Sequence, residues 1–122
     1  MPKVDPRVER TIATMHAQLD RRLTLSALAQ EVRLSVAHLT RLFRADTGVT
    51  PAAYLRGVRM QRARVLVERT SLSVAEVMAQ VGVSDRSHFA RDFRRAHGSS
   101  PRMMRMQLRS RGDHPGVFSR FG

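Results

Sequence analysis

Hydrophobic residues recur every three or four positions along most of this chain, which is the spacing of amphipathic helices rather than of strands. Between residues 73 and 81, one such stripe is formed by Val74, Val77, Met78 and Val81. Ser73 and Glu76 have the spacing of a capping box, so a short helix is predicted to begin there. Gly82 stands where the chain must turn with positive φ, and it is predicted to end this helix.

A second, longer helix is predicted directly after this turn, with Ser84 as the candidate N-cap and Gly98 near its end. Its inner stripe consists of Phe89, Phe93 and Ala96. Its opposite side carries Ser87, Arg91, Arg94 and Arg95. A short helix, a turn and a longer helix with a basic outer face indicate a helix-turn-helix, which places its second helix in a major groove. Two packed amphipathic helices with a solvated cationic face are the alternative.

The same pattern occurs earlier in the chain, between residues 24 and 51. A shift of 49 places Thr24, Leu28, Val32, Leu34 and Ser35 on Ser73, Val77, Val81, Val83 and Ser84. A shift of 50 places Leu39, Arg41, Phe43, Arg44, Gly48 and Pro51 on Phe89, Arg91, Phe93, Arg94, Gly98 and Pro101. The repeat therefore predicts two copies of one unit, with the one-residue slip in the turn or in the first turn of the second helix.

Arg33 occupies the position in the first copy that Gly82 fills in the second. Either this turn avoids positive φ, or Arg33 carries a strain of about 1 kcal/mol.

Further helices are predicted around the two copies. Asp5 and Pro6 start the first one, with Val8, Ile12, Met15 and Leu19 on one face. Thr50 and Pro51 start a linker helix over residues 51–69, with apolar residues on more than one side: Ala52, Leu55, Val58, Met60, Ala63, Leu66 and Val67. At 1.5 Å per residue it would span roughly 27 Å, against the roughly 34 Å between successive major grooves. A last helix after Pro101 offers Met103, Met104 and Leu108 to the second unit.

These elements predict an all-α fold of seven helices, in which the linker helix joins two helix-turn-helix units. One domain is expected over residues 1–109, with helix one and the first unit in 1–50, the linker helix in 51–69, and the second unit with the last helix in 70–109. Residues 110–122 are expected to form a basic flexible tail.

The charge favours a polyphosphate partner. Lysine and arginine number 22 against 10 acidic residues, for a net charge of +12 and an isoelectric point near 11.9. Membrane surfaces and other acidic partners remain open on charge alone. The sequence has no apolar signal core and no run of about 18 apolar residues, so a soluble cytoplasmic protein without membrane contact is expected.

Enzymatic activity is not expected from this sequence. It has no cysteine, and its five histidines form neither an i, i+4 pair nor a pairing with a carboxylate at metal-ligand spacing, so we expect no metal and no cofactor. His38 and His88 are interpreted as flanking a recognition surface, and His97 as capping a helix end.

The second copy contains the most specific pattern: Val77, Gly82, Phe89, Arg91, Phe93, Gly98, Ser100, Pro101 and Arg105. With it, residues 6–108 resemble the DNA-binding domain of AraC/XylS-type transcription regulators. The resemblance implies sequence-specific binding to double-stranded DNA as a monomer, with recognition helices at about 35–48 and 84–97 in adjacent major grooves. It also implies a role in transcription regulation, either as an activator or as a repressor, with RNA polymerase as a candidate partner. Met78, Val83 and Met104 depart from the family pattern, each by one apolar residue for another. A free-standing small regulator and the C-terminal part of a larger one both fit.

Carried over by position, the base-facing residues are Ala37, Thr40 and Arg41 in the first unit and Arg86, Ser87, Ala90 and Arg91 in the second. Phosphate contacts fall to Arg44 and Arg94 and to the helix N-termini at Thr24 and Ser73. Ala37 can touch only a thymine methyl group, Thr40 can bond to almost any base, and Arg41 suits guanine. A basic module that binds nucleic acid or another partner without sequence preference is the alternative function.

Overall fold

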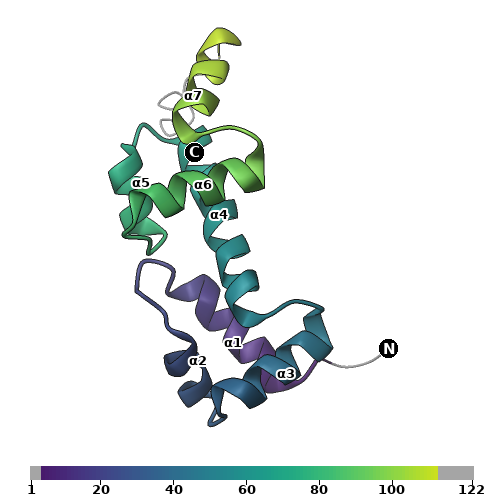
Figure 1. Cartoon of the computed structure of the whole chain (residues 1–122). Coiled ribbons are helices and arrows are strands. Elements are labelled where there is room, and N and C mark those ends of the chain that lie inside the picture. The colour runs from purple at the N-terminus through teal and green to yellow at the C-terminus, as the bar shows by residue number, and fades with distance from the viewer. Residues whose placement is uncertain (1–3, 113–122) are drawn as a thin grey trace. The chain divides into compact units, whose positions relative to one another are not determined.

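The structure is a computed structural model that describes residues 4–112. Within this range the chain forms seven α-helices and no β-strand, which confirms the predicted all-α fold (Figure 1). In chain order they are α1 (Pro6–Ala17), α2 (Leu25–Glu31), α3 (Val36–Thr47), α4 (Pro51–Arg69), α5 (Val74–Gln80), α6 (Arg86–His97) and α7 (Pro101–Ser110). The chain divides into two compact units, Met1–Val58 and Arg59–Gly122, whose boundary lies within α4.

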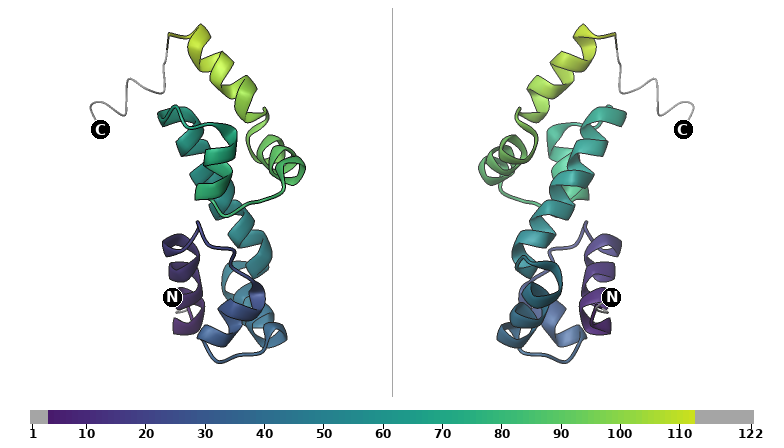
Figure 2. Two further views of the ribbon diagram at one scale, coloured as in Figure 1. Left: turned by 90° about the vertical axis from the view of Figure 1, so that its left-hand side faces the viewer. Right: turned by 90° about the vertical axis from the view of Figure 1, so that its right-hand side faces the viewer.

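The first unit consists of α1, α2, α3 and the start of α4. Figure 2 shows α1 beside the α2 and α3 pair, and α1 packs against both of these helices. The buried side chains of this unit are Val8, Met15, Leu19, Leu28, Ala29, Val32, Leu39, Phe43 and Leu55. The ring of Phe43 meets the ring of Tyr54 edge to face, with the centroids 5.3 Å apart. The start of α4 therefore closes the core beneath the second helix of the helix-turn-helix.

Polar contacts also hold α1 to α2, and the hydrophobic pattern did not predict them. The hydroxyl of Thr14, which is buried, donates to a carboxylate oxygen of Glu31 at 2.7 Å. The same oxygen accepts from Nε of Arg10 at 3.3 Å. Thr11 is buried too, and its hydroxyl donates to the Arg7 carbonyl within α1. The inner face of α1 is therefore partly polar, with each buried hydroxyl satisfied.

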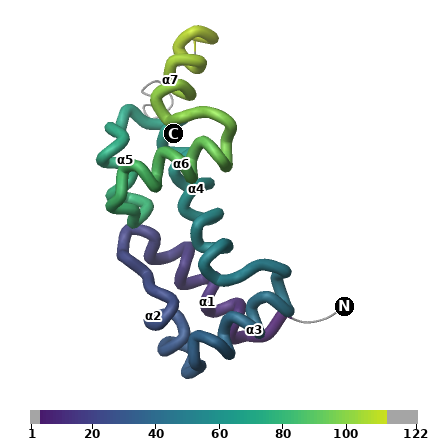
Figure 3. The backbone as a smooth tube through the Cα atoms, viewed as in Figure 1, coloured from purple at the N-terminus to yellow at the C-terminus, as the bar shows by residue number. Residues whose placement is uncertain are grey.

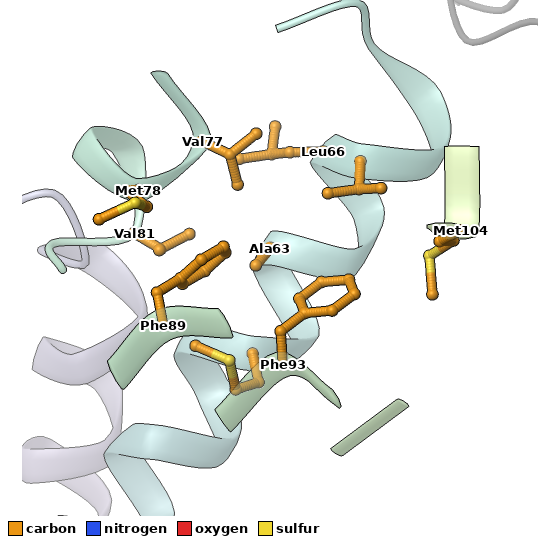
Figure 4. Close-up of a cluster of buried hydrophobic side chains, with 10 residues drawn as sticks. Ala63, Leu66, Val77, Met78, Val81, Phe89, Phe93 and Met104 are labelled. Atoms are coloured by element: carbon orange, nitrogen blue, oxygen red, sulfur yellow. The ribbon is translucent and has the colours of Figure 1, made fainter. Parts of the chain in front are cut away.

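The second unit is built around the rest of α4, with α5, α6 and α7 packed on it. Figure 4 shows its core, to which α4 contributes Ala63 and Leu66 and α6 contributes Phe89 and Phe93. Val77, Met78 and Val81 of α5 and Met104 of α7 complete this cluster. Each of the four helices thus supplies at least one buried side chain.

Two side chains of this unit hydrogen-bond to backbone carbonyls of α4 and of Thr70, the residue that follows it. A ring nitrogen of His97 lies 2.8 Å from the Met60 carbonyl oxygen, and the ring packs edge-on against Phe93. The guanidinium of Arg105 donates to the carbonyls of Val67 and Thr70 at 3.2 and 3.3 Å, at the C-terminal end of α4. Burial lowers the pKa of this guanidinium, and neighbouring Arg109 lowers it further. The prediction that His97 caps a helix end is wrong, because Gly98 is the C-cap of α6.

Three residues that were assigned to apolar stripes are exposed: Ala52, Ala96 and Met103. Ala96 lies one turn beyond Phe93 on α6, where His97 rather than Ala96 turns toward α4. On α7 the buried residues are Pro101 and Met104, while Met103 and Met106 face solvent. The spacing alone did not separate these positions, because a period of 3.6 leaves neighbouring residues close to the same stripe.

Figure 3 traces the backbone through the two turns, between α2 and α3 and between α5 and α6. The two turns share a characteristic hydrogen bond. The N–H of Leu34 reaches the carbonyl of Ala29 at 2.9 Å, and the N–H of Val83 reaches that of Met78 at 3.0 Å. A hydrogen bond between residues five positions apart at a helix end is typical of a Schellman motif, which requires one residue of positive φ. Arg33 takes that conformation in the first turn. Of the two alternatives for Arg33, the structure therefore shows the strained one.

Candidate nucleic-acid interface

The second helix of each unit is capped at both ends, which fixes where its outer face begins. Ser35 caps α3 by accepting from the N–H of His38 at 3.0 Å. Asp85 caps α6 by accepting from the N–H of His88 at 2.8 Å, and this bond lowers the pKa of the Asp85 carboxyl. The prediction of Ser84 as the cap is wrong by one residue. Ser84 lies in the turn, which is where the one-residue slip of the repeat falls.

The recognition helices expected at about 35–48 and 84–97 are therefore Val36–Thr47 and Arg86–His97. A shift of 50 relates the two helices over their whole length, so Ala37, Thr40 and Arg41 correspond to Ser87, Ala90 and Arg91.

The expected base-facing residues of α3 lie on its outer surface. Ala37 and Arg41 are exposed and Thr40 is half-buried, while Leu39 and Phe43 are buried on the other side. The hydroxyl of Thr40 donates to the Val36 carbonyl at 2.8 Å. Because that bond uses its only hydrogen, in this conformation the Thr40 hydroxyl can accept a further hydrogen bond but cannot donate one.

Val36 is an exposed apolar residue in the first turn of α3 that the sequence reasoning did not single out. It is the first residue of α3, and 37% of its surface is exposed. Because Val36 lies three residues before buried Leu39, the helical period places it on the core stripe. Only the structure shows that the first turn leaves it uncovered.

All four expected base-facing residues of α6 are exposed: Arg86, Ser87, Ala90 and Arg91. Ser87 and Arg91 lie opposite Phe89 and Phe93, which are buried against α4 and α5, whereas Arg86 is exposed in the first turn. The exposed residues of this set on α6 thus include two guanidinium groups and a hydroxyl, where those of α3 include one guanidinium group.

Arg44 and Arg94, the expected phosphate contacts, are exposed one turn beyond Arg41 and Arg91. Residues three apart on a helix are neighbours, so each pair of arginines forms one basic strip. Within residues 4–112, these four guanidinium groups form no ion pair with a carboxylate. Their charge is therefore available to a partner.

The two helix N-termini proposed for phosphate contact differ in charge. The hydroxyl of Thr24 accepts from the N–H of Ala27 at 3.0 Å, and the first turn of α2 has no acidic residue. At α5, the Glu76 carboxylate accepts from the N–H of Ser73 at 2.9 Å, and this bond lowers the pKa of Glu76. A phosphate at that end would meet a carboxylate that stays ionised at neutral pH. The structure thus favours the Thr24 end over the Ser73 end.

Other kinds of site were sought in the same residues. Among the side chains of residues 4–112, no group of three or more His, Cys, Asp or Glu residues is arranged to hold a metal ion. None of the helices described combines the length and apolar character needed to cross a bilayer.

Comparison with known proteins places this geometry in a family. A sequence model described as a helix-turn-helix domain matches residues 28–107, about two thirds of the chain. A transcriptional regulator of Chromobacterium violaceum, described as AraC-type DNA-binding domain-containing, has a solved structure with a TM-score of 0.75 and 30% identity over 84% of this chain and 91% of that one. The chain belongs to the AraC-type helix-turn-helix family.

Two more members of this family extend over most of the chain. The uncharacterized HTH-type transcriptional regulator YidL of Escherichia coli is 34% identical over 116 residues, which are 93% of this chain and 38% of YidL. The DNA-binding domain of AdpA, a global transcriptional factor solved in complex with a target DNA, has a TM-score of 0.81 and 30% identity over 86% of this chain and 95% of that domain. The chain spans about a third of the length of the curated relatives it matches.

Proposed function

We propose that this chain binds double-stranded DNA sequence-specifically and regulates transcription. The observation that carries the proposal is the repeated pair of arginines, Arg41 with Arg44 and Arg91 with Arg94, on the outer faces of two capped helices. Each pair lies opposite two buried side chains of its own unit, so the arginines are held outward by the packing. A helix with this basic face fits the major groove, whose phosphates flank the base edges.

Within this proposal, the two arginines of each pair have different roles, one in base contact and the other in phosphate contact. Arg41 and Arg91 lie nearer the helix N-terminus and reach base edges, where a guanidinium can bind O6 and N7 of guanine together. Arg44 and Arg94 lie one turn further on and bind phosphate, with the backbone N–H groups at Thr24 as an additional phosphate contact. Arg86 and Ser87 add donors to the second helix, and Ala90 adds a methyl group.

The names and descriptions of the relatives support this proposed function. AdpA carries a domain of the same fold that was solved in complex with a target DNA, and YidL is named as an uncharacterized HTH-type transcriptional regulator. We propose that the two recognition helices occupy adjacent major grooves of one asymmetric site, with the chain acting as a monomer in the cytoplasm. RNA polymerase is the proposed protein partner of the chain.

A non-specific nucleic-acid-binding module is the alternative, because the charge of +12 alone would attract DNA. Selection of bound duplexes from a random pool separates the two functions. A sequence-specific protein should enrich an asymmetric motif and bind it at least about a thousandfold more tightly than a scrambled duplex. Enrichment without any motif would support the alternative, and an affinity that barely changes between about 50 and 200 mM salt would contradict both.

A further inference from the structure

We infer that the first turn of α3 reads the 5-methyl group of thymine, with Val36 as a base-reading residue beside Ala37 and Thr40. This inference rests on the proposed function and specifies what one of its two recognition helices recognises. It assigns the first unit a preference for A·T base pairs that the second unit does not share to the same extent.

The three side chains form one continuous patch on the helix surface. Thr40 lies four residues after Val36 and three after Ala37, the two spacings that make helical side chains neighbours. Val36 and Ala37 are exposed, and the hydroxyl of Thr40 is bonded back to the Val36 carbonyl at 2.8 Å. The patch therefore presents methyl groups and one oxygen that can only accept.

This chemistry matches an A·T base pair better than a G·C pair. In the major groove thymine is the only base with a methyl group, and adenine offers its N6 amino group as a donor. A G·C pair also has a donor in the major groove, the N4 amino group of cytosine, so the acceptor oxygen of Thr40 does not distinguish the two pairs. The preference for A·T therefore rests on the thymine methyl group, which a G·C pair lacks. The patch lies in the N-terminal turn, the part of a recognition helix that approaches base edges in helix-turn-helix proteins.

The repeat supplies an internal comparison. At the positions of Val36 and Ala37, α6 carries Arg86 and Ser87, both exposed and both hydrogen-bond donors. Only Ala90, at the position of Thr40, is apolar there. The two helices share a backbone arrangement and differ in the chemistry of the first turn, so their half-sites should differ in the same way.

Uracil substitution tests the inference, because deoxyuridine pairs as thymine does and lacks only the methyl group. The half-site of α3 is first located as the positions whose preference relaxes when Arg41→Ala is carried through the selection. Each thymine of that half-site is then replaced by deoxyuridine in a duplex titrated at fixed salt. We expect a loss of affinity of about fourfold for each methyl group contacted.

The protein variant Val36→Thr replaces one methyl group by a hydroxyl at nearly constant shape. We expect it to remove most of the uracil loss at one thymine position, while affinity for the uracil duplex changes little. Val49→Thr is the matched control, because Val49 is 42% exposed against 37% for Val36 and lies beyond the end of α3. This control should keep the full uracil loss.

Three results would overturn the inference. Equal affinity for thymine and uracil duplexes would show that no methyl group is read, and an undiminished uracil loss in Val36→Thr would show that Val36 does not read it. Both results leave the proposed function intact, since specific binding to the thymine duplex is measured in the same titration. Failure to enrich any motif would overturn the proposed function and this inference together.

Discussion

Arg33 has the backbone conformation of Gly82, with φ of 59° against 76°, at the same position of the two helix-turn-helix turns. The flanking hydrogen bonds match as well, since the N–H groups of Arg33 and Gly82 reach the carbonyls of Gln30 and Ala79 at 3.0 and 3.3 Å. Arg33 is the only non-glycine residue of positive φ among residues 4–112. Its Cβ makes this conformation costly, whereas glycine adopts it freely.

We therefore expect Arg33→Gly to raise the free energy of unfolding by about 0.5–1 kcal/mol, since the relief of strain exceeds the greater flexibility of glycine in the unfolded chain. A urea titration of both proteins measures the difference. Gly82→Ala is the matched control and should destabilise by a similar amount. A lower stability of Arg33→Gly would mean that the arginine side chain makes contacts that outweigh the strain.

The sequence predicted this fold well because its local signals agree with one another. The caps at Asp5, Thr24, Ser35, Thr50 and Ser73 all accept from a backbone N–H as expected. The two helix-turn-helix patterns are each weak alone, and the internal repeat made them a strong indication together. Helix boundaries and the location of the two cores followed from signals that act within about five residues along the chain.

Contacts between distant residues could not be predicted in this way. Thr14 to Glu31, His97 to Met60 and Arg105 to Val67 join residues 17 to 38 positions apart. Each depends on where a polar side chain ends up once the helices have packed, which the 3.6-residue period does not specify. For the same reason, the exposure of Met103 was not predicted.

The candidate interface was predicted in its position but not in its chemistry. Arg41 and Arg91 lie on outer faces because Phe43 and Phe93 fix the inner faces, which a helical projection already shows. The helical period places Val36 on the inner face instead, and no periodicity could reveal the bond that leaves Thr40 only as an acceptor. Side-chain hydrogen bonding and coverage of a first turn are properties of the folded chain.

The capping box of α5 should make stability depend on pH. Hydrogen bonding from the Ser73 backbone lowers the pKa of Glu76 below its usual value of 4.5. A group with a lowered folded-state pKa stabilises above its unfolded pKa, and this stabilisation is lost as the pH falls through the folded value. We expect Glu76→Gln to have a lower melting temperature than the parent at pH 7, and the two to converge as the pH falls through the lowered folded-state pKa of Glu76.

Ser73→Ala is the companion variant for the capping box. It removes the acceptor for the Glu76 N–H, which lies 3.1 Å from the Ser73 hydroxyl oxygen. Loss of such a cap costs about 1 kcal/mol of stability. This cost should not depend on pH, because the serine hydroxyl does not titrate. An equal difference between Glu76→Gln and the parent at pH 3 and pH 7 would contradict the titration of this carboxylate.

Arg105 should stabilise the second unit through the end of α4. Replacement by methionine removes both bonds to the carbonyls of Val67 and Thr70 and leaves these acceptors without that donor. We expect Arg105→Met to lower the free energy of unfolding by about 1–2 kcal/mol. Arg102→Met, at an exposed position of the same helix, should change it by less than about 0.5 kcal/mol. Equal effects of the two substitutions would rule out a specific role for the bonds of Arg105.

The two recognition helices should contribute unequally to specific affinity. Arg91 is accompanied on α6 by exposed Arg86 and Ser87, whereas Arg41 is accompanied on α3 by Val36 and Ala37. We expect the additional donors to hold α6 in register on the DNA, which would preorganise the bidentate geometry of Arg91.

Arg91→Ala should therefore cost more specific affinity than Arg41→Ala, with each loss in the range of about 1–3 kcal/mol. Titration of the selected duplex and of a scrambled duplex at one salt concentration separates this loss from the loss of charge. Arg62→Ala, an exposed arginine of α4, removes the same charge outside the recognition helices and should weaken both duplexes alike. The reverse ranking of Arg41 and Arg91 would place the stronger base contact in the first unit, and an equal loss on both duplexes would move Arg91 from base reading to phosphate binding.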